Sequence, residues 1–347
     1  MKGYPVTSSQ LRTATAAATD VGRKRSGNED SFALWVSDET GEDHLVDTLL
    51  VVADGMGGSN AGEVASRMVV ETVVREVSQT RAADAAAALG HAIEVANAEV
   101  HEHSRSRADL AGMGTTCTVV GLKGDKLSLA HVGDSRAYLV RRGRIRQLTQ
   151  DHSLVAQLVA RKQLTLEQAK TDPRRNVVTR SVGVGPAVEV DSETMDEPLQ
   201  PGDTLILCSD GLHGLMTDED LARIGSGPSL DRACRELIAL ANQNGGPDNI
   251  TVAMARLEGA EGDEYAPPMA LRPDARDDAP AGGSSRETAA PRSRRQRMLQ
   301  LLIVALIALL IVLCGLVWVV FAKMHDSGAQ QSSTHVKAEA KEQLAWR

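Results

Sequence analysis

Aromatic residues are scarce in this chain, and cysteines are few. Phe, Trp and Tyr together make up 2% of the 347 residues, so a hydrophobic core must be built from Val, Leu, Ile, Ala and Met. The chain contains 4 cysteines and no Cys-x-x-Cys pair, and we expect reduced, buried thiols rather than disulfides. The formal net charge of -8 offers no overall basic character of the kind found in nucleic-acid-binding proteins, so no nucleic-acid partner is expected.

A secretory signal is also missing, because Met1 to Thr19 contains no sustained apolar stretch. The chain does contain one unbroken apolar run without charge or proline, Leu301 to Ala322. As a helix rising ~1.5 Å per residue, this run would span the ~30 Å hydrocarbon core of a bilayer. We therefore predict a transmembrane helix over residues 299–322; a buried core helix is the alternative, but such helices seldom run so long without a polar residue.

The basic segment Arg292 to Arg297 precedes the apolar run, and basic residues are sparser after it. The positive-inside rule then places the N-terminal side in the cytoplasm and residues 323–347 on the other side. The expected location is therefore the inner membrane, with a single pass through the lipid bilayer. Residues 258–298 are rich in Ala, Gly, Pro, Asp and Ser and predict a flexible linker with an end-to-end distance of about 30–40 Å.

The remaining globular part is expected over residues 18–257, preceded by a disordered N-terminus over residues 1–17. Strand-like runs recur within it, several of them joined by short turns that favour antiparallel hairpins. These runs are Thr48–Ala53, Thr115–Leu122, Leu127–Val132, Ala137–Arg141, Ile145–Leu148, Thr204–Cys208 and Ile250–Ala255. Apolar residues at helical spacing predict amphipathic helices over Val64–Val77, Leu89–Val100 and Cys234–Ala241. Antiparallel strands with separate helices define an α+β fold.

Acidic residues lie where predicted strands end. The apolar strand that begins at Leu49 stops at Asp54-Gly55, and the strand that begins at Thr204 stops at Asp210-Gly211. A sheet holds such an aspartate rigidly, and the following glycine permits a sharp turn and leaves the backbone carbonyl accessible. This arrangement suits a hard divalent cation, which binds oxygen ligands. Each motif alone is also an ordinary turn signal.

Three further acidic sites follow the same pattern: Glu29-Asp30 before an apolar stretch, Asp134 after a strand, and Asp248 before the last strand. Several carboxylates gathered without cations would repel one another and raise their own pKa values. Their number within one domain therefore predicts a metal site rather than unrelated turns.

Seven motifs in this order resemble the bacterial metal-dependent protein phosphatases of type 2C. They are Arg25-x-x-Asn-Glu-Asp30, Asp54-Gly-Met-Gly-Gly58, Gly114-Thr-Thr116, His131-Val-Gly-Asp-Ser-Arg136, Leu148-Thr-Gln-Asp-His152, Ser209-Asp-Gly211 and Gly246-Pro-Asp-Asn249. The resemblance covers essentially all of Ala18 to Leu257. It implies a sandwich of two antiparallel β-sheets flanked by helices (α-β-β-α), with two Mn²⁺ or Mg²⁺ ions at one edge and a weaker site for a third.

The resemblance also implies a role for each matching residue. Asp54 would bridge both ions, Asp210 and Asp248 would bind the first, Glu29 and the Gly55 carbonyl would bind the second, Asp134 would bind a weaker third ion, Asp30 would orient a water molecule, and Arg25 would clamp the substrate phosphate. The implied reaction is direct hydrolysis of phosphoserine and phosphothreonine by a water that the ions activate, without a phosphoenzyme. The expected partners are phosphorylated proteins and a cognate membrane-associated Ser/Thr kinase.

Two features concern the surroundings of this site. Some relatives have a histidine where this chain has Met56, so a metal-bound water is the expected proton donor; His152 is interpreted as a structural turn residue. Ser153 to Gly183 resembles the family's flap, which lies beside the site. Its arginines Arg174, Arg175 and Arg180 are candidates for contacting acidic phosphopeptides, although surface arginines often serve only solubility.

Two alternative functions belong to other classes of protein. A membrane-tethered adaptor would bind phosphoproteins without hydrolysing them, but it would not need the intact set of ligand positions. A different two-metal hydrolase, such as a nuclease, is disfavoured by the acidic net charge.

Overall fold

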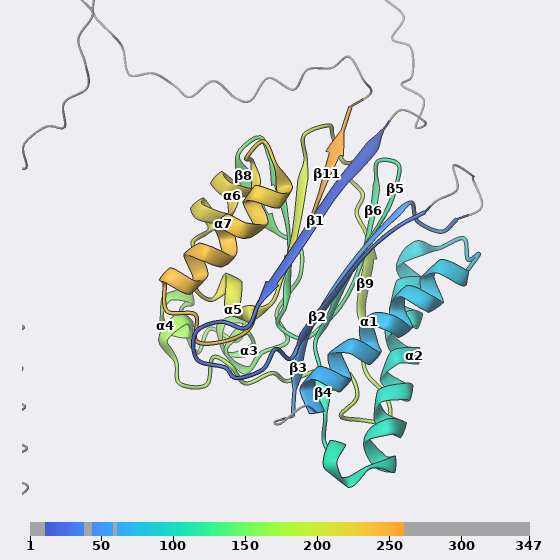
Figure 1. The fold of residues 1–347 in the computed structure, drawn as a ribbon, viewed down its shortest axis with the longest axis vertical. Coiled ribbons are helices and arrows are strands. Elements are labelled where there is room, and N and C mark those ends of the chain that lie inside the picture. The colour runs from blue at the N-terminus through green and yellow to red at the C-terminus, as the bar shows by residue number, and fades with distance from the viewer. Residues whose placement is uncertain (1–10, 38–43, 58–60, 260–347) are drawn as a thin grey trace, which may run out of the picture. The chain divides into compact units, whose positions relative to one another are not determined.

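The computed structural model describes residues 11–37, 44–57 and 61–259, and these residues form four layers in the order helices, sheet, sheet, helices (Figure 1). The first sheet has five antiparallel strands in the order β1-β11-β10-β7-β8. Their bounds are Arg12–Asp20 (β1), Ile250–Glu258 (β11), Thr204–Cys208 (β10), Arg136–Arg141 (β7) and Arg144–Gln147 (β8).

The second sheet is antiparallel in the order β2-β3-β5-β6-β9, and the short strand β4 adds to β3. Its bounds are Asp30–Val36 (β2), Thr48–Met56 (β3), Gly114–Thr115 (β4), Cys117–Lys123 (β5), Lys126–Val132 (β6) and Asp191–Thr194 (β9). The predicted α+β sandwich of two antiparallel sheets is therefore confirmed.

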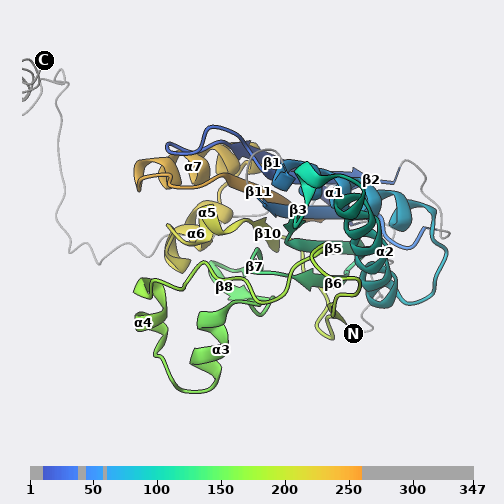
Figure 2. The ribbon, with the colours of Figure 1, turned by 90° about the horizontal axis from the view of Figure 1, so that it is seen from below.

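Helices α1 (Ala61–Gln79) and α2 (Ala85–Ser106) cover the outer face of the second sheet, followed by the short 3-10 helix η2 (Ala108–Leu110). Helices α5 (Asp210–His213), α6 (Asp218–Gly225) and α7 (Leu230–Gln243) lie on the side of the first sheet (Figure 2). The stripes predicted from apolar spacing fall within α1, α2 and α7, and their residues Val69, Ile93 and Leu237 are fully buried. These helices form because their apolar faces are removed from water against the sheets.

Three hydrophobic clusters separate the layers. One joins α1 and α2 to the second sheet, and another joins the α5–α7 helices to the first sheet. The third lies between the sheets, where Leu50 and Val120 of one sheet and Leu207 and Ala253 of the other are all buried. Aliphatic side chains make up most of this core, as the scarcity of aromatic residues requires.

The flap contains two short helices, α3 (Leu154–Ala160) and α4 (Leu166–Thr171), and projects away from the sandwich in Figure 2. Side-chain caps start both helices: Ser153 accepts a hydrogen bond from the Ala156 N–H, and Thr165 forms a capping box with Gln168. Neither helix contains a buried residue. The flap is thus held by local hydrogen bonds and by its root rather than by a core.

The structure differs from the sequence interpretation at the N-terminus. Strand β1 begins at Arg12, so residues 12–17, predicted to be disordered, are ordered by antiparallel pairing with β11. This strand was not predicted, because its small Ala and Thr side chains give no clear hydrophobic pattern. Strands β2 and β9 were also not predicted; β9 is an exposed, polar edge strand.

Cys117, Cys208 and Cys234 are free and buried, as predicted, whereas Cys314 lies outside the described residues. The predicted linker from residue 260 on, the transmembrane helix at 299–322 and the tail at 323–347 also lie outside them. Among the helices that the structure describes, none is long and apolar enough to cross a membrane.

Candidate metal centre

Asp30 and Asp54 face each other at the end of the β2–β3 ladder, where their Cα atoms form a pair in the antiparallel register. Asp30 starts β2, and its Oδ2 accepts a hydrogen bond of 2.8 Å from the Ser209 hydroxyl at the end of β10. The backbone N–H of Asp54 donates to the hydroxyl of Thr116, which lies between β4 and β5, at 2.9 Å. The pairing of β2 with β3 thereby brings two acidic motifs, distant in sequence, to one sheet edge.

Asp210 and Asp248 reach the same edge from the other sheet. Asp210 begins α5 directly after β10, and Asp248 lies two residues before β11, the neighbour of β10. Close packing of these two segments depends on Gly211, because a Cβ there would lie 1.9 Å from the Asn249 carbonyl oxygen. Only glycine permits this approach, which explains the Asp-Gly pair on physical grounds.

Glu29 and Gly55 lie where α1 begins. The Gly55 N–H donates to the Glu29 carbonyl at 3.1 Å, and a Cβ on Gly55 would lie 2.2 Å from the Gly62 carbonyl oxygen. A Cβ on Gly62 would in turn lie 2.9 Å from the Glu29 carboxyl group. The predicted ligands of the second ion therefore meet beside the first turn of α1.

Asp134 follows β6 in a turn whose Gly133 has a φ of 114°. Its side chain is buried, and its carbonyl accepts a hydrogen bond from His213 Nε2 at 2.9 Å. Burial, followed by repulsion from Asp210, raises the pKa of Asp134 to about 7. The residue predicted for a weaker third ion therefore lies within electrostatic reach of Asp210.

Burial and mutual repulsion disfavour the ionised form of the carboxylates at this edge. Burial is the largest cause that raises the pKa of Asp30 to about 7 and that of Asp54 well above its usual value. The pKa of Asp210 is also raised, by burial and then by the charge of Asp248. An interaction with the Asp54 side chain acts in the opposite direction and lowers the pKa of Asp210.

The donor set at this edge fits hard divalent cations, because it supplies carboxylate and carbonyl oxygens whose mutual repulsion a cation would offset. Asp30 Oδ1 is buried and has no hydrogen-bond partner among the described residues. As the side chains stand, the described part of the chain contains no group of three His, Cys, Asp or Glu residues that could hold an ion. One of the predicted ligands, Asp248, is instead paired with an arginine.

That arginine is Arg25. Its Nη2 donates to Asp248 Oδ2 at 2.7 Å, and this hydrogen bond is the main cause that raises the pKa of Arg25. The Arg25 side chain is 51% exposed, so it lies at the rim of the edge. The charges of Glu29 and Asp54 also act on it. The predicted phosphate clamp is therefore beside the predicted ligands.

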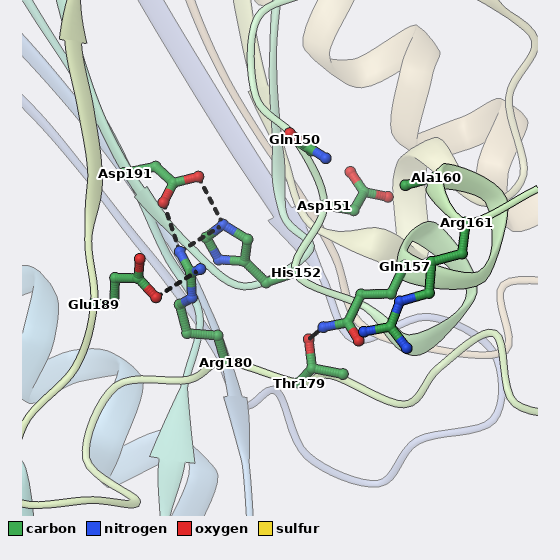
Figure 3. A pocket seen from close by; sticks show the side chains of 10 residues that line it. All are labelled: Gln150, Asp151, His152, Gln157, Ala160, Arg161, Thr179, Arg180, Glu189 and Asp191. Atoms are coloured by element: carbon green, nitrogen blue, oxygen red, sulfur yellow. Dashed lines mark hydrogen bonds and ion pairs between the residues drawn. The ribbon is translucent and has the colours of Figure 1, made fainter.

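The flap arginines occupy different surroundings. Arg174 pairs with Asp172 inside the flap, and Arg175 is exposed. Figure 3 shows Arg180 turned toward Asp191 and Glu189, with which it forms ion pairs beside a pocket of about 460 Å³. Arg180 is thus already partnered by carboxylates of this chain.

His152 has a structural role, as interpreted from the sequence. Its Nδ1 accepts the Gly133 N–H at 3.0 Å, and its Nε2 lies 3.0 Å from Asp191 Oδ2 and 3.1 Å from Arg180 Nη1 (Figure 3). Its side chain is buried, and its backbone links the Asp134 turn to the flap root through Gly133 and Thr179.

Sequence reasoning missed the residues that align the acidic motifs. Asn249 accepts the Glu29 N–H through its side-chain oxygen and donates to the carbonyls of Val21 and Gly27. Ser209 accepts the Thr251 N–H and donates to Asp30. Both residues belong to motifs quoted above, but the sequence alone did not indicate that their side chains hold these motifs together.

Comparison with known proteins agrees with this geometry. Residues 22–254 match the family described as protein phosphatase 2C. The serine/threonine phosphatase stp of Listeria monocytogenes is 39% identical over 245 residues, which cover 69% of this chain and 94% of that protein. A domain of this size therefore makes up nearly the whole of that relative.

Solved structures show the same similarity. The S. agalactiae serine/threonine phosphatase superimposes with a TM-score of 0.65 at 36% identity, covering 71% of this chain and all of that one. The catalytic domain of the phosphatase PstP, in complex with two manganese ions, superimposes with a TM-score of 0.61 at 33% identity, covering 72% of this chain and 99% of that one.

This chain belongs to the protein phosphatase 2C family. It is a metal-dependent serine/threonine protein phosphatase, and phosphatases of this type use two Mn²⁺ or Mg²⁺ ions.

Proposed function

We propose that the acidic edge described above holds the ions and that the reaction takes place there. Asp54 would bind both ions, Asp210 and Asp248 would bind the first, Glu29 and the Gly55 carbonyl would bind the second, and Asp134 would bind a weaker third. The supporting observation is that Asp30 and Asp54, paired at the end of the β2–β3 ladder, lie at the same edge as Asp210 and Asp248, where burial and mutual repulsion raise the pKa values of Asp30, Asp54 and Asp210. When bound, the ions would lower the pKa of a water molecule and make it a nucleophile toward phosphorus.

The chain's own groups bind and orient the reactants. Arg25 presents two N–H groups in a plane, which matches two oxygens of a phosphate monoester. Asp30 holds one carboxylate oxygen on Ser209 and leaves Oδ1 to accept a hydrogen bond from the attacking water, which orients that water. The side chain of Met56 has no proton to donate, so protonation of the leaving serine or threonine oxygen is not assigned to it.

We further propose that a tether keeps this domain at the cytoplasmic face of a membrane. The apolar run at 301–322 supports the tether, and the basic segment at 292–297 supports the orientation. A linker over 258–298 would let the domain reach phosphoserine and phosphothreonine on nearby proteins, and a membrane-associated Ser/Thr kinase is the expected opposing enzyme.

Turnover of a phosphothreonine peptide, measured against Mn²⁺ concentration, tests the catalytic assignment. Asp54→Asn should reduce turnover by at least ~10³-fold at saturating Mn²⁺, because a bridging charge is lost. Asp196→Asn, at an exposed site, should leave turnover unchanged. Full activity of Asp54→Asn would refute the assignment; phosphopeptide binding without turnover by the wild type would identify an adaptor, and DNA degradation would identify a nuclease.

The tether is tested separately. The full chain should remain in the membrane fraction after a high-salt wash, and alkaline phosphatase fused to its C-terminus should be active. An inactive fusion on a membrane-bound chain would contradict the orientation without affecting the catalytic assignment.

A further inference from the structure

The flap exposes an unusual share of apolar surface. Among the described residues, the exposed large hydrophobic side chains are Val36, Leu166, Val177 and Val184, with exposed fractions of 50%, 69%, 45% and 55%. Leu166 and Val177 are in the flap, and Val184 follows it directly. No residue from Leu154 to Arg180 is buried, and none packs against the three hydrophobic clusters. These apolar side chains therefore contribute little to the core of this domain.

The flap is also basic in an otherwise acidic chain. Residues 153–183 contain Arg161, Lys162, Lys170, Arg174, Arg175 and Arg180 but only two acidic residues, Glu167 and Asp172. The net charge of this segment is therefore positive, whereas that of the whole chain is -8.

Three of these basic side chains are unpaired. Glu167 forms an ion pair with Lys170, and Asp172 forms one with Arg174. Arg161, Lys162 and Arg175 are exposed and form no ion pair with any residue that the structure describes. Their charges are available to an anionic partner.

Lys162 occupies a backbone position that normally favours glycine. Its φ is 59°, and it ends α3 in a Schellman motif, in which the Lys162 N–H donates to Val159 and the Gln163 N–H donates to Leu158. A glycine would adopt this conformation without strain. Lysine therefore places an exposed positive charge at the end of α3 at some cost in backbone strain.

We propose that the flap docks on an anionic lipid surface through Arg161, Lys162 and Arg175, with Leu166 and Val177 entering the interface. Exposed basic side chains combined with exposed apolar ones are the chemistry that binds the headgroup region of anionic bilayers. An acidic phosphopeptide would satisfy the charges but gives no reason for Leu166 to be exposed. The proposal rests on the proposed tether, which keeps the domain close to such a surface.

Docking of the flap would also determine which substrates the active edge meets. Val182, at the flap root, forms a β-bridge with Thr115, and Thr115 pairs with Gly55, next to Asp54. Two successive backbone pairings therefore connect the flap root to the metal edge. A docked flap holds that edge near the bilayer and favours phosphorylated residues close to the membrane.

Vesicle flotation of a fragment ending at Gly259 tests the proposal without the apolar run. This fragment keeps all three hydrophobic clusters, and a domain of this extent makes up nearly the whole of a relative. It should float with vesicles that contain phosphatidylglycerol but not with pure phosphatidylcholine, and high salt should release it. Arg161→Gln/Lys162→Gln should weaken binding about thirtyfold, given the contribution of each basic residue near such a surface.

Matched controls use the same chemistry on other faces. Arg105→Gln/Arg232→Gln removes two exposed charges from α2 and α7, and should leave flotation within about twofold of wild type. Leu166→Ser should weaken flotation, whereas Val36→Ser should not, although both side chains are exposed. Thermal melting of each variant verifies folding.

Equal losses in the flap and control variants, or no binding to anionic vesicles, would overturn the proposal. So would a phosphopeptide whose affinity falls in Arg161→Gln/Lys162→Gln while vesicle binding is retained, since that result assigns the surface to substrate. Each of these results concerns the flap alone: the tether is judged by fractionation of the full chain, and catalysis by turnover.

Discussion

Arg25 Nη2 lies 2.7 Å from Asp248 Oδ2, so the proposed phosphate clamp is bound to a proposed metal ligand. The two groups are 51% and 26% exposed, which places their contact at the rim of the acidic edge. A divalent cation on Asp248 competes with the guanidinium for the same carboxylate. Metal binding would therefore release Arg25 toward the phosphate, and the two events are coupled.

This coupling predicts opposite effects of Arg25→Ala on substrate and metal. The KM for a phosphothreonine peptide should rise about tenfold to hundredfold, because a hydrogen bond to a charged group is worth about 1.5–3 kcal/mol. The Mn²⁺ concentration for half-maximal activity should fall, because a competing cation is gone. Lys24→Ala, at an exposed neighbouring site, should change neither value. A higher Mn²⁺ requirement with an unchanged KM would contradict the coupling.

The close approach of Gly211, in α5, to Asn249, just before β11, predicts that Gly211→Ala is severely destabilising. The new Cβ would lie 1.9 Å from the Asn249 carbonyl oxygen, and backbone rather than a flexible side chain would have to move. We expect a loss of about 2–4 kcal/mol in the free energy of unfolding, together with reduced turnover, since Asp210 and Asp248 flank the contact. Urea denaturation and peptide turnover measure the two effects.

Gly27→Ala provides the control, because nothing lies within 4 Å of a Cβ at that position. Its free energy of unfolding should remain within about 0.5 kcal/mol of wild type, or rise slightly through reduced freedom of the unfolded chain. Similar losses in the free energy of unfolding for both variants would show that the contact at Gly211 is not the cause of the destabilisation.

The sequence predicted those parts of the fold whose side chains alternate or repeat strongly. β10 was predicted with its observed bounds, and α1, α2 and α7 follow their apolar stripes. β1 was missed because its Ala and Thr residues give no clear apolar pattern; pairing with β11 stabilises it instead. Its ordering is a tertiary effect that local sequence does not contain.

The site could be predicted as a set of residues but not as an arrangement. Asp54 and Asp210 were recognisable from the strand-Asp-Gly pattern. The Arg25–Asp248 ion pair was not, because it joins residues 223 positions apart in the sequence. The positions of the flap arginines were equally hidden, since Arg180 is partnered by Asp191 only through the fold.

Asp134 predicts that the metal-free domain loses stability as pH rises. Its pKa is about 7 in the folded domain and about 4 in an unfolded chain, so between these values the folded state binds more protons. The free energy of unfolding therefore falls as pH rises from about 4 to about 7. In chelator, Asp134→Asn should be more stable than wild type by about 1–4 kcal/mol at pH 8 and nearly equal to it at pH 4.

Saturating Mn²⁺ should shrink this difference or reverse its sign, because the cation stabilises the ionised wild-type carboxylate. Urea denaturation at both pH values, with and without Mn²⁺, measures the effect. Asp196→Asn, exposed outside the acidic edge, should show no such dependence. An Asp134→Asn variant that is less stable than wild type at pH 8 in chelator would contradict the assigned repulsion.

The buried His131 ring leads us to predict a contribution to stability that is lost as pH falls, opposite in sign to that of Asp134. Burial is the main cause that lowers its pKa to about 4, and the adjacent His152 ring, with its centroid 4.8 Å away, lowers it further. An unfolded histidine has a pKa of about 6.5, so between these values the unfolded state binds more protons. This contribution to stability is complete above about pH 6.5 and is lost as pH falls to about 4.

His131→Gln removes the titrating ring but retains a polar side chain near Thr118, which contacts His131 Nδ1 at 2.9 Å. The pH dependence between about 6.5 and 4 should flatten by about 2–3 kcal/mol relative to wild type, whatever the absolute stability of the variant. His91→Gln, at an exposed site on α2, should keep the wild-type slope. The carboxylates of the acidic edge change the free energy of unfolding with pH in the opposite direction. The test therefore compares how steeply this free energy changes with pH in the variant and in the wild type. Parallel curves for His131→Gln and wild type would mean that the buried ring does not resist protonation in the folded domain.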